Sequence, residues 1–107
     1  MARYQQTVLR AFVQVSDVLA ALAADRDNLA ARNLALAAAE ANVRDADNGY
    51  RLGGATLMQT VDAHRRLSRT RHDLAEAQGQ QFLDLVELYA ATAADWRVAE
   101  SGRAAAN

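Results

Sequence analysis

The chain has 107 residues and a formal net charge of -1, and it contains neither cysteine nor proline. This length allows one domain at most, and a free-standing nucleic-acid-binding protein usually carries a clear basic excess that is missing here. Without cysteine there is no disulfide, no thiol nucleophile and no cysteine-based zinc site. Strong helix formers (alanine, leucine, arginine, glutamine and glutamate) dominate, so the composition predicts an all-α fold.

The first predicted helix runs from about residue 4 to residue 51. Two positions of each seven-residue repeat would form the seam, that is, the stripe that packs against the other helix. The second of these positions is apolar at Phe12 and Leu19 and becomes polar further along, for example at Glu40 and Asp47. The seam should therefore be most complete near the start of the chain. The main seam position repeats every seven residues, as in helices that pack as a coiled coil, at Val8, Val15, Leu22, Leu29, Leu36, Val43 and Tyr50.

A stop signal and a start signal follow each other in the predicted turn, residues 52–56. Gly53 and Gly54 suit the left-handed backbone with which many helices end. Thr56 and Gln59 have the spacing of a capping box. In it the Thr56 hydroxyl accepts from the N–H of Gln59, and the Gln59 side chain accepts from the N–H of Thr56. We therefore predict a tight turn between two antiparallel helices.

The second predicted helix extends from about residue 57 to about residue 97, and residues 98–107 are predicted to be a frayed tail. Folding the chain back at the turn places Phe12 across from Trp96, and Leu19 across from Tyr89. Nearer the turn, Glu40 and Asp45 should face the basic region 65–69. Residues 1–107 are thus predicted to form a single helical hairpin.

A two-helix hairpin buries only one stripe of each helix, because a helix of this length is about 70 Å long and the pair cannot form a sphere. Several apolar side chains should lie outside that stripe. We therefore expect the hairpin to pack laterally into a helical bundle or an α-barrel. The side chains expected outside the stripe are Leu9, Val13, Val18, Leu34, Leu83 and Val86.

Other patterns favour ordinary surface roles over chemistry. The run 45–49 does not fit a calcium loop, because Gly49 is at the fifth position rather than the sixth, and Thr56 stands at the twelfth position, where such a loop has glutamate. His64, and His72 with Glu76, have no third metal ligand at a suitable spacing. The basic run 65–71 has acidic residues near it, and no serine has the setting of a nucleophile. We expect no enzyme activity, metal, cofactor or nucleic-acid partner.

The chain begins without the apolar core of a signal peptide, and no apolar stretch is expected to approach the ~20 residues of a membrane-spanning helix. From this the sequence predicts that the segment does not insert into a membrane directly. It also predicts that the chain on its own would stay in the cytoplasm.

Three segments resemble TolC-like outer-membrane efflux proteins. Residues 4–19 resemble the start of the last helical hairpin of that family, and residues 50–67 resemble its tip, with Tyr, Gly and Thr ahead of an apolar-acidic run. Residues 85–96 are similar to its closing motif but lack the glycine run. Full members are several times longer, so we interpret the chain as a fragment of one.

The resemblance implies an export function. Such proteins form trimeric channels with a long periplasmic α-barrel, whose hairpin tips meet a periplasmic adaptor protein. The positions implied for the adaptor-docking tip are Leu52, Gly53, Gly54 and Thr56, and those implied for the aperture are Gln59 and Asp62. In the full-length context this segment would lie in the outer membrane and periplasm.

Two alternatives stay open from the residues. One is a free-standing helical-bundle scaffold without transport activity, built from a dimer of hairpins. The other is a coiled coil that binds nucleic acid through the basic run 65–71.

Overall fold

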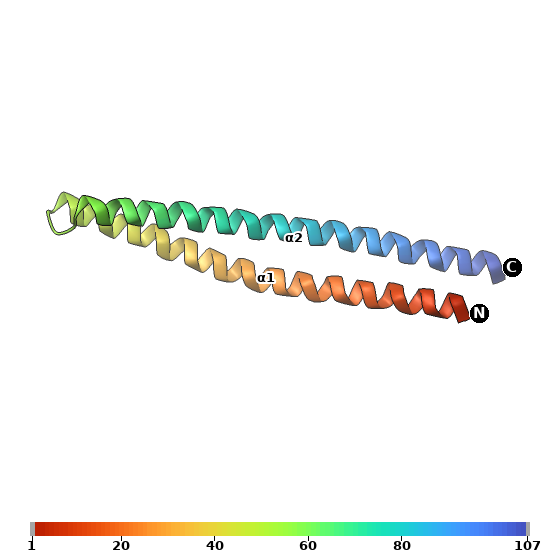
Figure 1. The fold of residues 1–107 in the computed structure, drawn as a ribbon. Coiled ribbons are helices and arrows are strands. Elements are labelled where there is room, and N and C mark those ends of the chain that lie inside the picture. Colours follow the sequence, from red (N-terminus) through yellow and green to blue (C-terminus); the bar gives the residue numbers. More distant parts are fainter. Residues whose placement is uncertain (1, 107) are drawn as a thin grey trace. The chain divides into compact units, whose positions relative to one another are not determined.

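The computed structural model describes residues 2–106, and the side chains of residues 3–104. Ala2–Arg51 form helix α1, Leu57–Ala106 form helix α2, and residues 52–56 connect them (Figure 1). No strand occurs in the described range. The predicted all-α fold of two long helices is confirmed.

Helix α2 continues past the point where the sequence placed its end. We predicted a frayed tail from residue 98 onward, whereas the helix extends to Ala106. Alanine is the best helix former, and it fills the last positions of the helix. The single weak position there, Gly102, costs only about 1 kcal/mol relative to alanine, and no proline follows it to stop the helix.

The chain divides into two compact units, each built from one segment of α1 and one segment of α2. The terminal unit comprises Met1–Asp25 with Gln80–Asn107, and the turn unit comprises Arg26–Gly79. Each unit has its own buried side chains and is described separately.

The turn unit has a small core that connects the two helices. Val43, Ala63 and Leu67 are buried, and Leu36, Ala39 and Ala46 pack against them. Leu36 and Val43 belong to the predicted seam. The second stripe of the seam is alanine, at positions 39 and 46, rather than the predicted Glu40 and Asp47. Small side chains at these positions leave room for the side chain of Leu67, which is only 7% exposed.

The register of the terminal unit also differs from the prediction. Val18 is 4% exposed and Ala91 is 3% exposed, whereas Leu19, which was predicted to lie in the seam, is 51% exposed. Val18 had been expected outside the seam. The buried stripe thus lies one residue earlier than predicted, at Ala11 and Val18, so that it alternates by three and four residues with the stripe through Val15 and Leu22.

The aromatic side chains of the terminal unit do not pack between its helices. Phe12, Tyr89 and Trp96 are all exposed, with Tyr89 at 76%. The predicted contacts of Phe12 with Trp96 and of Leu19 with Tyr89 were therefore wrong. A helix turns about 100° per residue, so a shift of one residue in the buried stripe moves these side chains to the outside of the pair.

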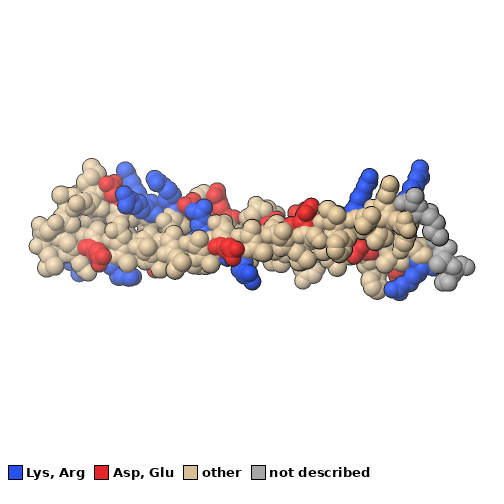
Figure 2. All heavy atoms as spheres, turned by 90° about the horizontal axis from the view of Figure 1, so that it is seen from below, with Lys and Arg blue, Asp and Glu red and all other residues tan. Residues whose placement is uncertain are grey.

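Basic and acidic side chains are interspersed on the surface (Figure 2). The predicted match of Glu40 and Asp45 with the basic region 65–69 forms no ion pair among residues 3–104, although Asp45 and Arg66 line one groove. An ion pair between an arginine and a carboxylate does link α1 and α2 in the turn unit: Arg32 Nη1 lies 3.6 Å from Asp73 Oδ2. Both of its side chains are partly solvated, so it contributes little to stability.

Helix α1 contains an 18-residue stretch that is apolar enough, by length and composition alone, to cross a membrane, with a mean hydropathy of 1.5. By this measure the prediction that no stretch comes close was wrong. Alanine, valine and leucine raise the mean despite the polar residues between them. Signal sequences and core helices of soluble proteins pass the same test, so it is weak support for a membrane span.

Candidate functional site

The end of α1 forms a Schellman motif. Gly53 has a φ angle of +80°, which L-amino acids rarely adopt. Its N–H donates to the carbonyl of Tyr50 at 3.1 Å, and the N–H of Gly54 donates to the carbonyl of Gly49 at 2.8 Å. These two bonds satisfy carbonyls that the helix would otherwise leave unpaired. Gly53 is therefore the residue that stops the helix.

Gly49 has a role in the turn that the sequence did not reveal. Its carbonyl also accepts from the N–H of Ala55 at 3.1 Å, so it binds two residues of the connection. A Cβ atom at Gly49 would lie only 3.0 Å from the Cβ of Ala55. The missing side chain thus allows the chain to return closely over the end of α1. The only available signal was its spacing, four residues before Gly53.

The start of α2 is the predicted capping box. The N–H of Gln59 donates to Thr56 Oγ1 at 3.1 Å, and the N–H of Thr56 donates to Gln59 Oε1 at 2.9 Å. This prediction is confirmed. Two backbone donors at the start of α2 are satisfied by side chains. Gln59 is an aperture candidate from the family resemblance, and its side-chain oxygen Oε1 therefore has a structural role in the turn.

The turn presents apolar side chains to solvent. Leu52 is 87% exposed, and Leu57 and Met58 on the first turn of α2 are also exposed. A Cβ atom at Gly54 would have ordinary contact only, with the carbonyl oxygen of Gly49 at 3.8 Å. The backbone of the turn is thus held by hydrogen bonds, whereas its outer surface is free for contact.

Asp62 and Gln59 lie together at one groove of the turn unit. The groove is open and shallow, and it runs between α1 and α2 just beyond the turn. Both charge signs are present, since Arg66 follows Asp62 by one helical turn. The side chains around it come from Asn42, Asp45, Ala46, Ala55, Gln59, Asp62 and Arg66. The structure brings the two aperture candidates to the same face.

Each histidine of the turn unit lies within hydrogen-bonding distance of a single carboxylate. His64 Nε2 lies 3.2 Å from Asp47 Oδ1 across the two helices, and His72 Nε2 lies 3.2 Å from Glu76 Oε1 within α2. Within the described range, no cluster of three or more possible metal ligands occurs. Each histidine is thus placed as a helix-surface residue in contact with one carboxylate.

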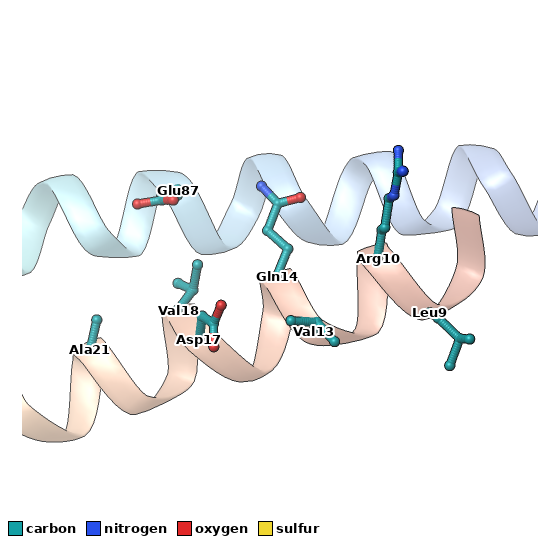
Figure 3. A pocket seen from close by; sticks show the side chains of 8 residues that line it. All are labelled: Leu9, Arg10, Val13, Gln14, Asp17, Val18, Ala21 and Glu87. Carbon is teal, nitrogen blue, oxygen red and sulfur yellow. The ribbon is translucent and has the colours of Figure 1, made fainter. Parts of the chain in front are cut away.

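The terminal unit has a groove of its own, which the sequence did not predict. Arg10 and Gln14 extend from α1 toward α2, and Leu9 points away from α2 (Figure 3). The lining is mainly apolar with a charged margin. It is formed by Leu9, Arg10, Val13, Gln14, Asp17, Val18, Ala21 and Glu87. This groove marks a part of the terminal unit where the two helices leave apolar surface uncovered.

The sequence profile of the family described as "Outer membrane efflux protein" matches residues 1–94. The chain belongs to this family of outer-membrane efflux channel components. The predicted resemblance is confirmed, and the class is one of transporters rather than enzymes.

The chain is also similar to individual proteins whose names describe efflux systems. The chain is 27% identical over 97 residues to "Cation efflux system protein CusC" of Escherichia coli O6:H1, covering 91% of this chain and 21% of that protein. It is 31% identical over 96 residues to "Probable efflux pump outer membrane protein TtgC" of Pseudomonas putida KT2440, covering 90% and 20%. The same figures apply to "Antibiotic efflux pump outer membrane protein ArpC" of Pseudomonas putida.

The chain therefore spans about a fifth of the length of these relatives. The comparison with solved structures gave no significant match.

Proposed function

We propose that the chain is the tip-bearing helical hairpin of an outer-membrane efflux channel, and that its turn docks a periplasmic adaptor protein. The contact residues are Leu52, Gly53, Gly54 and Thr56. The channel exports a solute or drug from the cell, and this hairpin contributes one piece of its periplasmic α-barrel. The observation that carries the proposal is the turn itself, in a chain that belongs to the efflux family.

The rigidity of the turn supports docking. The Schellman motif at Gly53 and the capping box at Thr56 tie both helix ends to the connection by hydrogen bonds. A surface that is already held in one conformation loses little conformational entropy when a partner binds.

The exposed surface of the turn supports docking as well. Leu52 is the most exposed large apolar side chain among the described residues, at 87%. Apolar side chains that stay in solvent at a helix end offer area for burial, and Gly53 and Gly54, which have no side chains, let a partner approach the backbone closely. A helical hairpin tip of an adaptor would bury them.

A charge placed at Gly54 tests this proposal. The 107 residues are grafted in place of the corresponding hairpin of a full-length family channel, and Gly54→Asp is introduced. Nothing crowds this position, so the change is expected to leave the turn intact. We expect normal trimers, loss of adaptor binding in pull-down assays, and loss of drug resistance in cells.

Gly79→Asp is the matched control, because a Cβ atom there meets nothing within 4 Å and one at Gly54 makes only an ordinary contact at 3.8 Å. It adds the same charge on α2, away from the turn, and is expected to leave adaptor binding unchanged. Full adaptor binding and full resistance with Gly54→Asp would refute the docking role, whereas failure of the unmodified graft to assemble would refute the assignment to the α-barrel.

We further propose that Asp62 and Gln59 face the channel aperture. They share one groove, and a carboxylate there would favour cations over anions. Asp62→Asn in the grafted channel is expected to reduce the preference for cations in single-channel recordings. Because Gln59 accepts a hydrogen bond in the capping box, its contribution to the aperture should be the smaller one. Unchanged ion selectivity with Asp62→Asn would contradict an aperture role for this carboxylate.

The partners of the terminal unit are proposed to be neighbouring helices of the trimeric channel. Most of the large apolar side chains that are exposed belong to this unit. They would lie against adjacent hairpins in the assembled α-barrel, in the outer membrane and periplasm. The hairpin itself would not insert into the bilayer.

The same exposed side chains favour a second candidate, a helical-bundle scaffold formed by copies of this chain. The molar mass of the isolated chain, measured by analytical ultracentrifugation, tests whether copies cover these surfaces. A defined dimer that shows no exchange into efflux channels would favour the scaffold, and a mixture of species would favour the channel fragment.

A further inference from the structure

Two aspartates face each other in the apolar seam of the terminal unit. Asp25 lies on α1 one heptad after Val18, and Asp84 lies on α2 one heptad before Ala91. Val18 and Ala91 are among the most buried residues of the chain, and Asp84 itself is only 8% exposed. A carboxyl group at such a position is unusual, because burying a charge without an opposite charge is costly.

The two carboxyl groups lie near enough for a hydrogen bond to form between them when one of them carries a proton. Ionised carboxylates only accept hydrogen bonds, so this contact requires a proton on one of them. Gln80 Nε2 donates to Asp84 Oδ1 at 3.1 Å, which supplies a donor to that carboxyl. Asp25 Oδ2 is buried and has no hydrogen-bond partner. With one proton shared between them, the two carboxyl groups carry one negative charge instead of two.

No cation offsets the pair. Arg26 and Asp27 follow Asp25 on α1, and Glu87 follows Asp84 on α2; all three side chains are exposed. Among the ion pairs of the described residues, none involves Asp25 or Asp84. Gln80 is neutral. If both aspartates ionise, their repulsion is therefore not balanced by a neighbouring positive charge.

The pKa of Asp25 is raised above its ordinary value of 3.8, first by the hydrogen bond to Asp84, then by burial and by the negative charge of Asp84. The folded state therefore binds a proton more tightly than the unfolded state does. The stabilisation is complete below the ordinary value and is lost as the pH rises through the raised value. The proton belongs to the pair rather than to one residue.

We propose that Asp25 and Asp84 form a proton-dependent clasp between α1 and α2 of the terminal unit. The clasp is closed when the two carboxyl groups share a proton and is loosened when both are ionised. It is separate from the docking turn and goes beyond the proposed function. The clasp makes the stability of the contact between α1 and α2 in the terminal unit depend on pH. The core of the turn unit, which contains Val43, Ala63 and Leu67, has no such pair of carboxyl groups.

Hydrogen–deuterium exchange of the 107-residue chain across pH 4 to 8 tests the clasp. After correction for the intrinsic pH dependence of exchange, the opening constant of amides around residues 18–29 and 80–91 should rise with pH, by up to about tenfold per pH unit for one proton. Amides around Val43 and Leu67 in the turn unit should show no such rise.

Asp25→Asn and Asp84→Asn each replace the shared proton by an amide donor, and both are expected to abolish the rise. Asp27→Asn removes an exposed aspartate of the same helix and should retain it. Persistence of the rise in Asp25→Asn, or an opening constant that falls with pH in the unmodified chain, would overturn the proposal.

A carbon-13 NMR titration of the aspartate carboxyl groups gives a second test that does not depend on stability. The titration midpoint of the Asp25 carboxyl is expected to be raised in the unmodified chain and to fall in Asp84→Asn. A midpoint of Asp25 that Asp84→Asn leaves unchanged would overturn the shared proton.

Discussion

The turn unit and the terminal unit use the same pair of helices in opposite ways. The turn unit buries Val43, Ala63 and Leu67 in a small core and ends in a hydrogen-bonded turn. The terminal unit leaves Phe12 and Tyr89 in solvent and places carboxyl groups in its seam. The turn unit thus has a small core and a hydrogen-bonded turn, whereas the terminal unit leaves most of its large apolar side chains in solvent. In a channel hairpin this division fits a tip that meets a partner and a body that packs into a wall.

The two units differ in what fills the seam. Alanines at positions 39, 46 and 63 allow the helices of the turn unit to pack around one leucine, Leu67. The terminal unit has alanine and valine at its buried positions, but its largest side chains lie outside. Burial of large apolar side chains is the main source of packing free energy. The terminal unit therefore has more to gain from lateral contacts than from its own seam.

The largest effect expected is from the core of the turn unit. Leu67→Ala should lower the free energy of unfolding by about 2 kcal/mol or more, because it removes buried methyl groups and leaves a cavity. Leu19→Ala in the terminal unit, where the side chain is half exposed, should cost below about 1 kcal/mol. Urea unfolding followed by circular dichroism measures both. Equal losses would remove the contrast between the units.

The next largest loss of stability is expected at Gly53, the residue that ends α1. Gly53→Val should destabilise the chain by about 1 kcal/mol or more, since a β-branched residue is strained at positive φ. Gly54→Ala is the control, because glycine is not required there. Thermal unfolding of both variants, compared with the unmodified chain, gives the difference. A melting temperature that Gly53→Val leaves unchanged would show that the turn relaxes freely and is not held as described.

A similar or slightly smaller effect is expected at the start of α2. Thr56→Ala removes the hydroxyl that caps the helix and should cost about 1 kcal/mol, whereas Thr56→Ser keeps the hydroxyl and should cost little. Hydrogen exchange of the Gln59 amide would locate the effect, since this N–H donates to Thr56 Oγ1. If alanine and serine behave alike, the capping box does not contribute to the stability of the tip.

The smallest effect is expected from the surface charges of the turn unit. Arg32→Gln breaks the ion pair with Asp73 and should change the free energy of unfolding by less than about 0.5 kcal/mol, because both side chains are partly solvated and salt screens them. The comparison is made at low and high salt. A large, salt-sensitive loss would mean that charge, rather than the core and the caps, holds this unit together.

The turn could be predicted because its signals are local. Gly53, Thr56 and Gln59 act on backbone groups within a few residues, so their spacing in the sequence is enough to define the motif. The role of Gly49 depends on the return of Ala55 over the helix end, and no local rule contains that contact. The seven-residue repeat likewise gave the main stripe through Leu36 and Val43 correctly.

The second stripe could not be predicted in the same way. Phe12 and Leu19 are larger and more apolar than Ala11 and Val18, so hydrophobicity alone favours them for the seam. Packing against α2 instead selects the smaller side chains, because they allow the helices to approach. The larger ones are left outside, where a single chain offers them no partner. The aspartate pair in the terminal unit was missed for the same reason, since Asp25 lies one heptad after Val18, which was expected outside the seam.

The docking claim is tested most directly by labelling a cysteine at the turn. The chain has no cysteine of its own, so Leu52→Cys in a grafted full-length channel made cysteine-free elsewhere gives a single reactive site, and Gly79→Cys in a parallel graft corrects for access of the reagent. We predict that the adaptor protein slows maleimide labelling at Leu52→Cys and leaves labelling at Gly79→Cys unchanged. Labelling of Leu52→Cys at the same rate with and without the adaptor would contradict the assignment of this turn as the docking tip.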